Sequence, residues 1–72
     1  MAIQALLFDK NYYTKQDVRK CIERNKLNPV KEIHTNDTYY RVRLITPDYK
    51  HHYYRFGHIA KGINCILEFN KY

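Results

Sequence analysis

The 72-residue sequence contains no tryptophan and no serine, and only two residues each of glycine, proline and cysteine. The scarcity of glycine and proline excludes fibrous and low-complexity chains, which are rich in one or both. The lack of serine removes a common catalytic nucleophile, and no glycine-rich phosphate-binding loop is present. No apolar run approaches the roughly 20 residues that a membrane-spanning helix needs. These absences argue against an enzyme and against a membrane protein.

The two cysteines, Cys21 and Cys65, are far apart and form no C-x-x-C motif. A secreted domain of this size usually carries several disulfides, so we interpret them as free thiols in a reducing compartment. Residues 2–8 are apolar but lack the positively charged leader of a signal peptide. We therefore expect an intracellular protein rather than a secreted one.

Basic residues are abundant and aromatic residues are mostly tyrosine. There are 13 Lys and Arg against 7 Asp and Glu, which gives a net charge of +6, and there are eight tyrosines. A basic surface attracts acidic partners, and tyrosine rings provide surfaces on which bases stack. The composition therefore favours a small binding module over other classes.

The first third of the chain has the pattern of a strand followed by a helix. Residues 2–8 form a nearly continuous apolar run, which predicts a strand buried on at least one face. Thr14 has the residue type of an N-cap, and Asp17 stands where a capping box requires an acceptor. We predict a helix over residues 15–26, ending before Pro29.

The remainder is dominated by strand patterns. Residues 30–35 predict a short strand, and the dipeptide at 36–37 has the residue types of a hairpin turn. Residues 38–46 alternate between apolar and basic side chains, which is typical of a strand with one packed and one wet face. A hairpin loop at 60–62 then leads to an alternating apolar strand over 63–69.

Residues 47–56 allow two interpretations. Tyr49, Tyr53 and Phe56 have helical spacing with Gly57 behind them, which fits a second helix. The aromatic density instead favours one helical turn after Pro47 followed by a strand, and we prefer this interpretation. The prediction is a single α+β domain over residues 1–72: one antiparallel sheet of four to five strands with one main helix packed on one face, in the order β-α-β-β-β-β. The alternative with a second helix has the βαββαβ order of ferredoxin-like folds.

The chain resembles a small α+β domain of unassigned function that recurs in tailed phages and large DNA viruses, alone or fused to head or packaging proteins. The similar segments are, in order, residues 5–8, 28–31, 38–43, 46–47, 54–55 and 61–63. The chain departs from the family pattern at Cys21, where a tryptophan is frequent, and at Glu68, where a glycine is frequent. The resemblance implies a viral or phage-associated protein of the host cell or the virion, and no particular activity.

A basic and aromatic surface is the main candidate site. Arg41 and Arg43 must share a sheet face with Tyr39, because strand side chains repeat every second residue. We expect this face to lie opposite the helix. Guanidinium groups bind phosphates in a bidentate manner, and sheet faces with aromatic residues bind single strands. The predicted nucleic-acid contacts, to DNA or RNA, are Tyr39, Arg41, Arg43, Tyr53 and Arg55, with Lys50 and Lys61 on phosphates.

Other chemistry is poorly supported. His51 and His52 are adjacent, so on a strand they would point to opposite faces, and the cysteines lie on other elements; we expect no metal site and no cofactor. Scattered acids and these histidines do not form a catalytic constellation. The alternative function is a protein-interaction or assembly module, either a homo-oligomer or one docked to a viral protein partner. It would use apolar residues on the sheet face that the helix leaves uncovered, namely Leu6 or Leu7, Ile45, Ile59 and Ile66.

Overall fold

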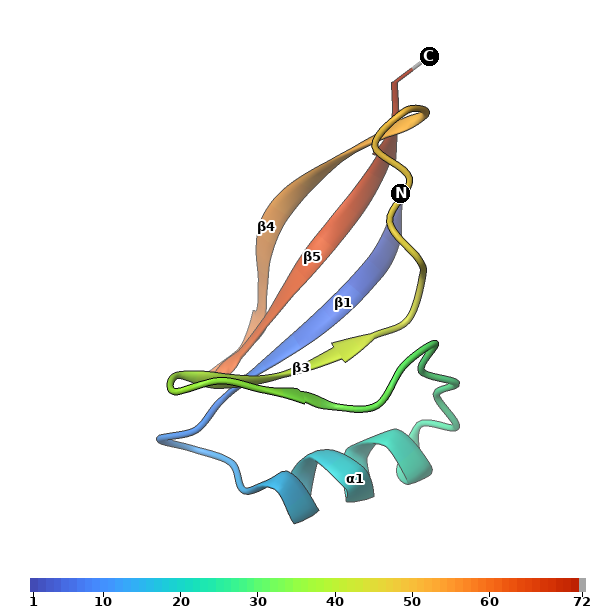
Figure 1. The fold of residues 1–72 in the computed structure, drawn as a ribbon. Coiled ribbons are helices and arrows are strands. Elements are labelled where there is room, and N and C mark those ends of the chain that lie inside the picture. Colours follow the sequence, from blue (N-terminus) through green and yellow to red (C-terminus); the bar gives the residue numbers. More distant parts are fainter. Residues whose placement is uncertain (72) are drawn as a thin grey trace.

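The computed structural model describes residues 1–71. It consists of one helix and one five-stranded antiparallel sheet (Figure 1). The elements in chain order are β1 (Ala2–Asp9), α1 (Lys15–Arg24), β2 (His34–Thr35), β3 (Tyr39–Arg43), β4 (His52–Ala60) and β5 (Ile63–Asn70).

The strand order in the sheet is β2-β3-β1-β5-β4, and every neighbouring pair is antiparallel. This confirms the predicted α+β class with one helix. Residues 49–51 form only a single turn, in which the amide of His52 donates to the carbonyl of Asp48 at 3.0 Å, and β4 follows directly. The preferred interpretation of residues 47–56 is therefore confirmed, and the ferredoxin-like alternative is wrong.

Helix α1 begins as the sequence predicts. The Thr14 hydroxyl accepts from the amide of Asp17 at 3.2 Å, and the Asp17 carboxylate accepts from the amide of Thr14 at 2.8 Å. This reciprocal pair satisfies backbone donors that have no partner within the helix. The helix ends at Arg24, two residues earlier than predicted, because Asn25 caps it and Lys26 adopts a left-handed φ of 52°.

The predicted strands exist, but two of them are shorter than expected. The segment over 30–35 pairs only at His34–Thr35. The strand over 38–46 stops at Arg43, because the amides of Leu44 and Ile45 both donate to the carbonyl of Gln4, which interrupts the regular ladder.

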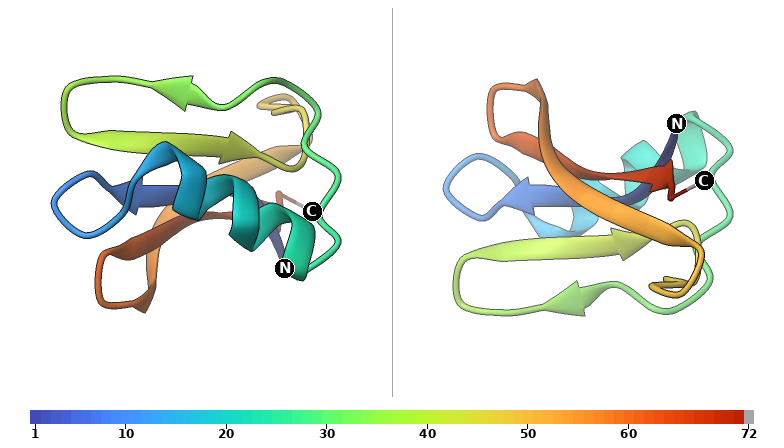
Figure 2. Two further views of the ribbon diagram at one scale, coloured as in Figure 1. Left: turned by 90° about the horizontal axis from the view of Figure 1, so that it is seen from below. Right: turned by 90° about the horizontal axis from the view of Figure 1, so that it is seen from above.

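The core lies between α1 and one face of the sheet, and Figure 2 shows the helix lying across the strands. Its buried members are Leu6, Phe8, Val18, Val42 and Cys65. The two cysteines are free, as predicted, although Cys21 on the helix is only half-buried. Within residues 1–71, no helix is long and apolar enough to cross a bilayer.

The β4–β5 hairpin contains an irregularity that decides which way the side chains of β4 point. At the turn Ala60 pairs with Ile63, and the next pair is His58 with Asn64, so Ile59 is left without a partner. This is a β-bulge with one extra residue on β4. A one-residue shift moves every following side chain of a strand to the other face of its sheet.

The sheet is strongly twisted, so β4 runs at a steep angle to β3 (Figure 2). The molecule is elongated, with principal extents of 38 × 20 × 20 Å. The ends of β1, β4 and β5 that are remote from α1 extend beyond the helix (Figure 1). We call the side of the sheet opposite α1 the open face; it carries Leu7 of β1, Arg41 of β3 and Ile66 of β5.

Candidate nucleic-acid interface

Arg41 and Arg43 lie on the open face, as the sequence predicts. Arg41 pairs with Leu7, and Arg43 pairs with Ala5, whereas Val42 between them is fully buried against the helix. The alternation of β3 thus divides a basic side from an apolar side. The two arginines therefore lie on the predicted face of the sheet, opposite the helix.

Neither arginine has a carboxylate partner. The two ion pairs in the described part of the chain each use a histidine, His51 with Asp48 and His52 with Glu68. Arg41 and Arg43 are half-buried, and the Nε of each is buried without a hydrogen-bond partner. An unpartnered buried donor is uncommon. Because solvent does not reach either Nε atom, a ligand would contact it only after the side chain turned outward.

A groove of about 290 Å³ lies on the open face. Arg41 does not line it, although Leu7, which does, is the strand partner of Arg41. Arg43 lines a separate hollow with Glu32 and His34. Leu7 and Ile66 line it together with Tyr39 of β3 and Phe56 of β4. Two other strands separate β3 from β4 in the sheet, and the twist brings these two rings to the same hollow. Phe56 is 69% exposed, so its ring is available to a ligand.

The polar residues of the groove are Asp9, Thr38 and Asn64. The Asp9 carboxylate accepts from the amide of Asn11 at 2.8 Å, so it is already used in the turn after β1. The side-chain oxygen of Asn64 lies 2.9 Å from Nδ1 of His58. The groove thus combines apolar and aromatic walls with one carboxylate, that of Asp9.

Tyr53 and Arg55 do not join Arg41 and Arg43, contrary to the prediction. Arg55 pairs with Leu67 and Tyr53 with Phe69, which places both on the helix side of the sheet. The cause is the bulge at Ile59, which the sequence pattern does not reveal. The even-numbered residues of β4 face the open side instead, and Phe56 is the one that sequence reasoning missed.

Tyr53 and Arg55 form a separate aromatic cluster with Phe69. The rings of Tyr53 and Phe69 are stacked, with centroids 5.2 Å apart and an angle of 13° between their planes. The guanidinium carbon of Arg55 lies 5.5 Å from the centroid of the Tyr53 ring. This cluster is a second cationic and aromatic surface, separated from the groove by the sheet itself.

Lys50 and Lys61 lie at opposite ends of β4, one before the strand and one in the turn after it. Both side chains are exposed. The ammonium of Lys61 lies 5.4 Å from the centroid of the Tyr12 ring, whereas the amide of Lys50 donates to the Asp48 carboxylate at 3.1 Å. The structure therefore does not bring the two lysines together.

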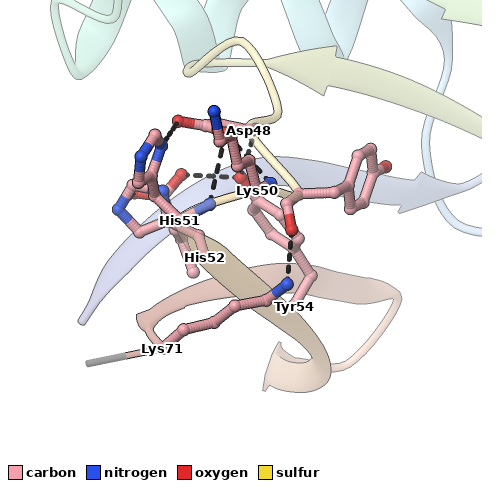
Figure 3. A network of polar contacts seen from close by, with 8 residues as sticks. Asp48, Lys50, His51, His52, Tyr54 and Lys71 are labelled. Carbon is pink, nitrogen blue, oxygen red and sulfur yellow. Dashed lines mark hydrogen bonds and ion pairs between the residues drawn. The ribbon is translucent and has the colours of Figure 1, made fainter.

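A polar network fixes the loop between β3 and β4 to one end of the open face (Figure 3). The amide of Asp48 donates to the hydroxyl of Tyr54 at 2.8 Å, and this hydroxyl donates to Glu68 at 2.9 Å. Nδ1 of His51 lies 2.9 Å from the Asp48 carboxylate. Because Tyr54 pairs with Glu68 at the Ala2 end of β1, the network occupies the end of the face that is remote from Tyr39.

The network perturbs two of its titratable groups. The hydrogen bond with the His51 ring is the main cause that lowers the pKa of Asp48 below its ordinary value. Desolvation raises the pKa of the Tyr54 hydroxyl above its ordinary value, and the nearby Glu68 carboxylate adds to the rise. Both shifts favour the protonation states present at neutral pH, namely the ionised Asp48 carboxylate and the neutral Tyr54 hydroxyl.

The apolar residues expected on the uncovered face are distributed in several ways. Leu7 and Ile66 line the groove, whereas Leu6 belongs to the core under the helix. Ile59 is the bulged residue and is 49% exposed, and Ile45 is half-buried in the segment after β3. Among residues 1–71, no three His, Cys, Asp or Glu side chains lie close enough together to hold a metal ion.

Comparisons with protein families, with curated proteins and with solved structures give no match to this chain.

Proposed function

We propose that this protein is a small binding module, not an enzyme, and that its open face binds single-stranded nucleic acid. The observation that carries the proposal is the pair Arg41 and Arg43, half-buried side by side on one strand without a carboxylate partner. In this proposal their guanidinium groups bind successive phosphates of the strand. The rings of Tyr39 and Phe56 provide the surfaces on which bases stack.

The net charge of +6 supports the proposal, because it attracts a polyanion at long range. Lys50 and Lys61 would contact phosphates at the two ends of β4. Tyr53 and Arg55 lie on the other side of the sheet, so a strand bound in the groove would reach them only by passing over the edge formed by β4. We assign them no contact with the bases in the groove.

The experiment is a salt titration of binding to a fluorescently labelled oligonucleotide of mixed sequence, single-stranded and double-stranded, followed by anisotropy. Replacing both Arg41 and Arg43 with alanine should lower the slope of log K against log salt by about 1.4, at about 0.7 per phosphate on a single strand. The matched control removes Arg19 and Arg24, two exposed arginines of α1, and should leave the slope nearly unchanged. An equal loss of slope in both double variants would remove the open face from the interface.

The second candidate is a protein-interaction module, and the apolar lining formed by Leu7 and Ile66 favours it. A protein segment seated there would bind with little dependence on salt, because apolar contacts are not screened. The salt titration therefore separates the two functions. We also propose a viral or phage setting, within the host cell or the virion, which is supported by the resemblance of the sequence alone.

A further inference from the structure

Strand β4 is a long sheet edge whose outer side is open. It lies at the end of the strand order, so only β5 pairs with it. Apart from that ladder, no backbone hydrogen bond joins residues 53–60 to another part of the described chain. A long edge with free amide and carbonyl groups is a template for pairing with another chain.

The other edge of the sheet is protected, and β4 is not. Strand β2 has only two residues and is preceded by the charged pair Lys31 and Glu32. Strand β4 has nine residues and contains no proline and no lysine. Its exposed side chains include Phe56 at 69% and Ile59 at 49%. The protective features that we identify on it are the bulge at Ile59, at the end of the strand next to the turn, and the single charged residue Arg55.

We propose that a second copy of this chain pairs with β4 in antiparallel orientation, so that two sheets join into one across a two-fold axis. This proposal does not depend on nucleic-acid binding. Directly opposite residues of an antiparallel pair point to the same face. In a symmetric pair, residues that face the same side can lie opposite each other only if one residue lies opposite its own copy. The two-fold axis therefore passes through that residue, which leaves few possible registers.

Phe56 is the middle residue of His52–Ala60. An axis through it pairs residues 54–58, the part of the strand before the bulge, because the bulge at Ile59 turns Ala60 to the other face. Each Phe56 then lies opposite the Phe56 of the second copy, and aromatic cross-strand pairs are favourable. Arg55 lies opposite Gly57, which leaves room for the long side chain. An axis one residue earlier would instead place two Arg55 side chains opposite each other, which is unfavourable.

The charge distribution favours a second copy as the occupant. Two chains of net charge +6 repel each other, so a self-association surface should be poor in permanent charge. Residues 52–60 meet this condition, because Arg55 is the only lysine, arginine, aspartate or glutamate among them.

The test is the molar mass in solution, measured without nucleic acid by light scattering over a wide concentration range. We expect a mass that rises to twice the 8.8 kDa of the monomer. Phe56→Glu would place two carboxylates opposite each other and should return the mass to that of the monomer. The matched control is Val30→Glu, which adds the same charge at a 46% exposed position. Val30 lies beside β3, where its amide donates to the carbonyl of Arg43, and two strands separate β3 from β4. This variant should leave the dimer intact.

Cross-linking tests the register. In a Cys21→Ala background, Phe56→Cys should form a disulfide-linked dimer, because the two sulfurs would face each other across the axis. His58→Cys should not, because its two copies would be about 13 Å apart along the strands, beyond disulfide reach. A monomeric mass at every concentration overturns the proposal. A dimer that survives Phe56→Glu and gives no cross-link through position 56 overturns it as well, since another surface would then be responsible.

Discussion

Gly57 is the position at which we expect the smallest change to have a large effect on stability. An added Cβ would lie 2.9 Å from Sγ of Cys65 and 3.1 Å from Cδ1 of Leu67. Both distances are below the roughly 3.5–4.0 Å of a favourable contact, and Cys65 is only 3% exposed, so it has little room to move. Overpacking of this kind costs about 1–3 kcal/mol. The lower entropy of alanine in the unfolded chain offsets about 0.4–1 kcal/mol of that cost.

We therefore expect Gly57→Ala to lower the free energy of unfolding by about 1–2 kcal/mol, from the balance of these two effects. In a domain of this size each 1 kcal/mol lowers Tm by roughly 4–8 °C. Urea unfolding followed by circular dichroism measures the change.

The Cys65→Ala variant provides the matching double-mutant cycle. It removes the sulfur that the new methyl group would contact, so the double variant should be clearly more stable than the sum of the two single effects predicts. The coupling should be at least about 0.5 kcal/mol. Additive effects, or a Gly57→Ala variant as stable as the parent, would refute the close approach of β4 to β5 at this point.

Two further predictions concern the capping box and the loop network. Thr14→Ala should lower the free energy of unfolding by about 1 kcal/mol, because it removes the acceptor for the amide of Asp17; thermal unfolding measures this, and an unchanged Tm would contradict the cap. The hydrogen bond with His51 lowers the pKa of Asp48. The ionised carboxylate therefore stabilises the folded state at pH values above its unfolded-state pKa, near 3.9. This stabilisation is lost as the pH falls through the lower folded-state pKa. The stability difference between the parent and Asp48→Asn should therefore be present at pH 7 and disappear in strong acid, and a difference independent of pH would show that the charge of Asp48 is not responsible.

Much of the fold follows from local patterns. The helix start at Thr14 and the alternation from Tyr39 to Arg43 depend on interactions between near neighbours in the sequence, so they are readable without a structure. The separation of Arg41 and Arg43 from the helix follows from the same alternation once Val42 is assigned to the core. These elements were predicted correctly for that reason.

The facing of β4 could not be predicted in this way. If the hairpin ladder ran regularly from the Ala60–Ile63 pair, Arg55 would lie opposite Glu68 on the open face, where the sequence analysis placed it. The bulge shifts the ladder by one residue, so Arg55 lies opposite Leu67 instead. The close packing of Gly57 on Cys65 fits this register, because a larger residue at that position would meet the sulfur.

The groove depends on an even longer-range property. Tyr39 and Phe56 belong to strands that are not neighbours in the sheet, and the sheet must twist before both can line one hollow. Residue types alone indicate that both rings favour strands, but they do not indicate that the rings meet. The candidate site was therefore half predictable: its arginines were found, and one of its two aromatic residues was missed.

The unpaired Ile59 also bears on how related sequences should be aligned. Deleting that single residue would leave the Ala60–Ile63 and His58–Asn64 pairs as direct neighbours, with Arg55 and Phe56 facing as they do now. A homologue that lacks only this residue would thus keep Arg55 on the helix side and Phe56 on the open face. An alignment that placed the gap elsewhere in the hairpin would assign these residues to the wrong faces. Chain length between Phe56 and the turn is consequently a better guide to surface chemistry in such homologues than residue identity at any one position.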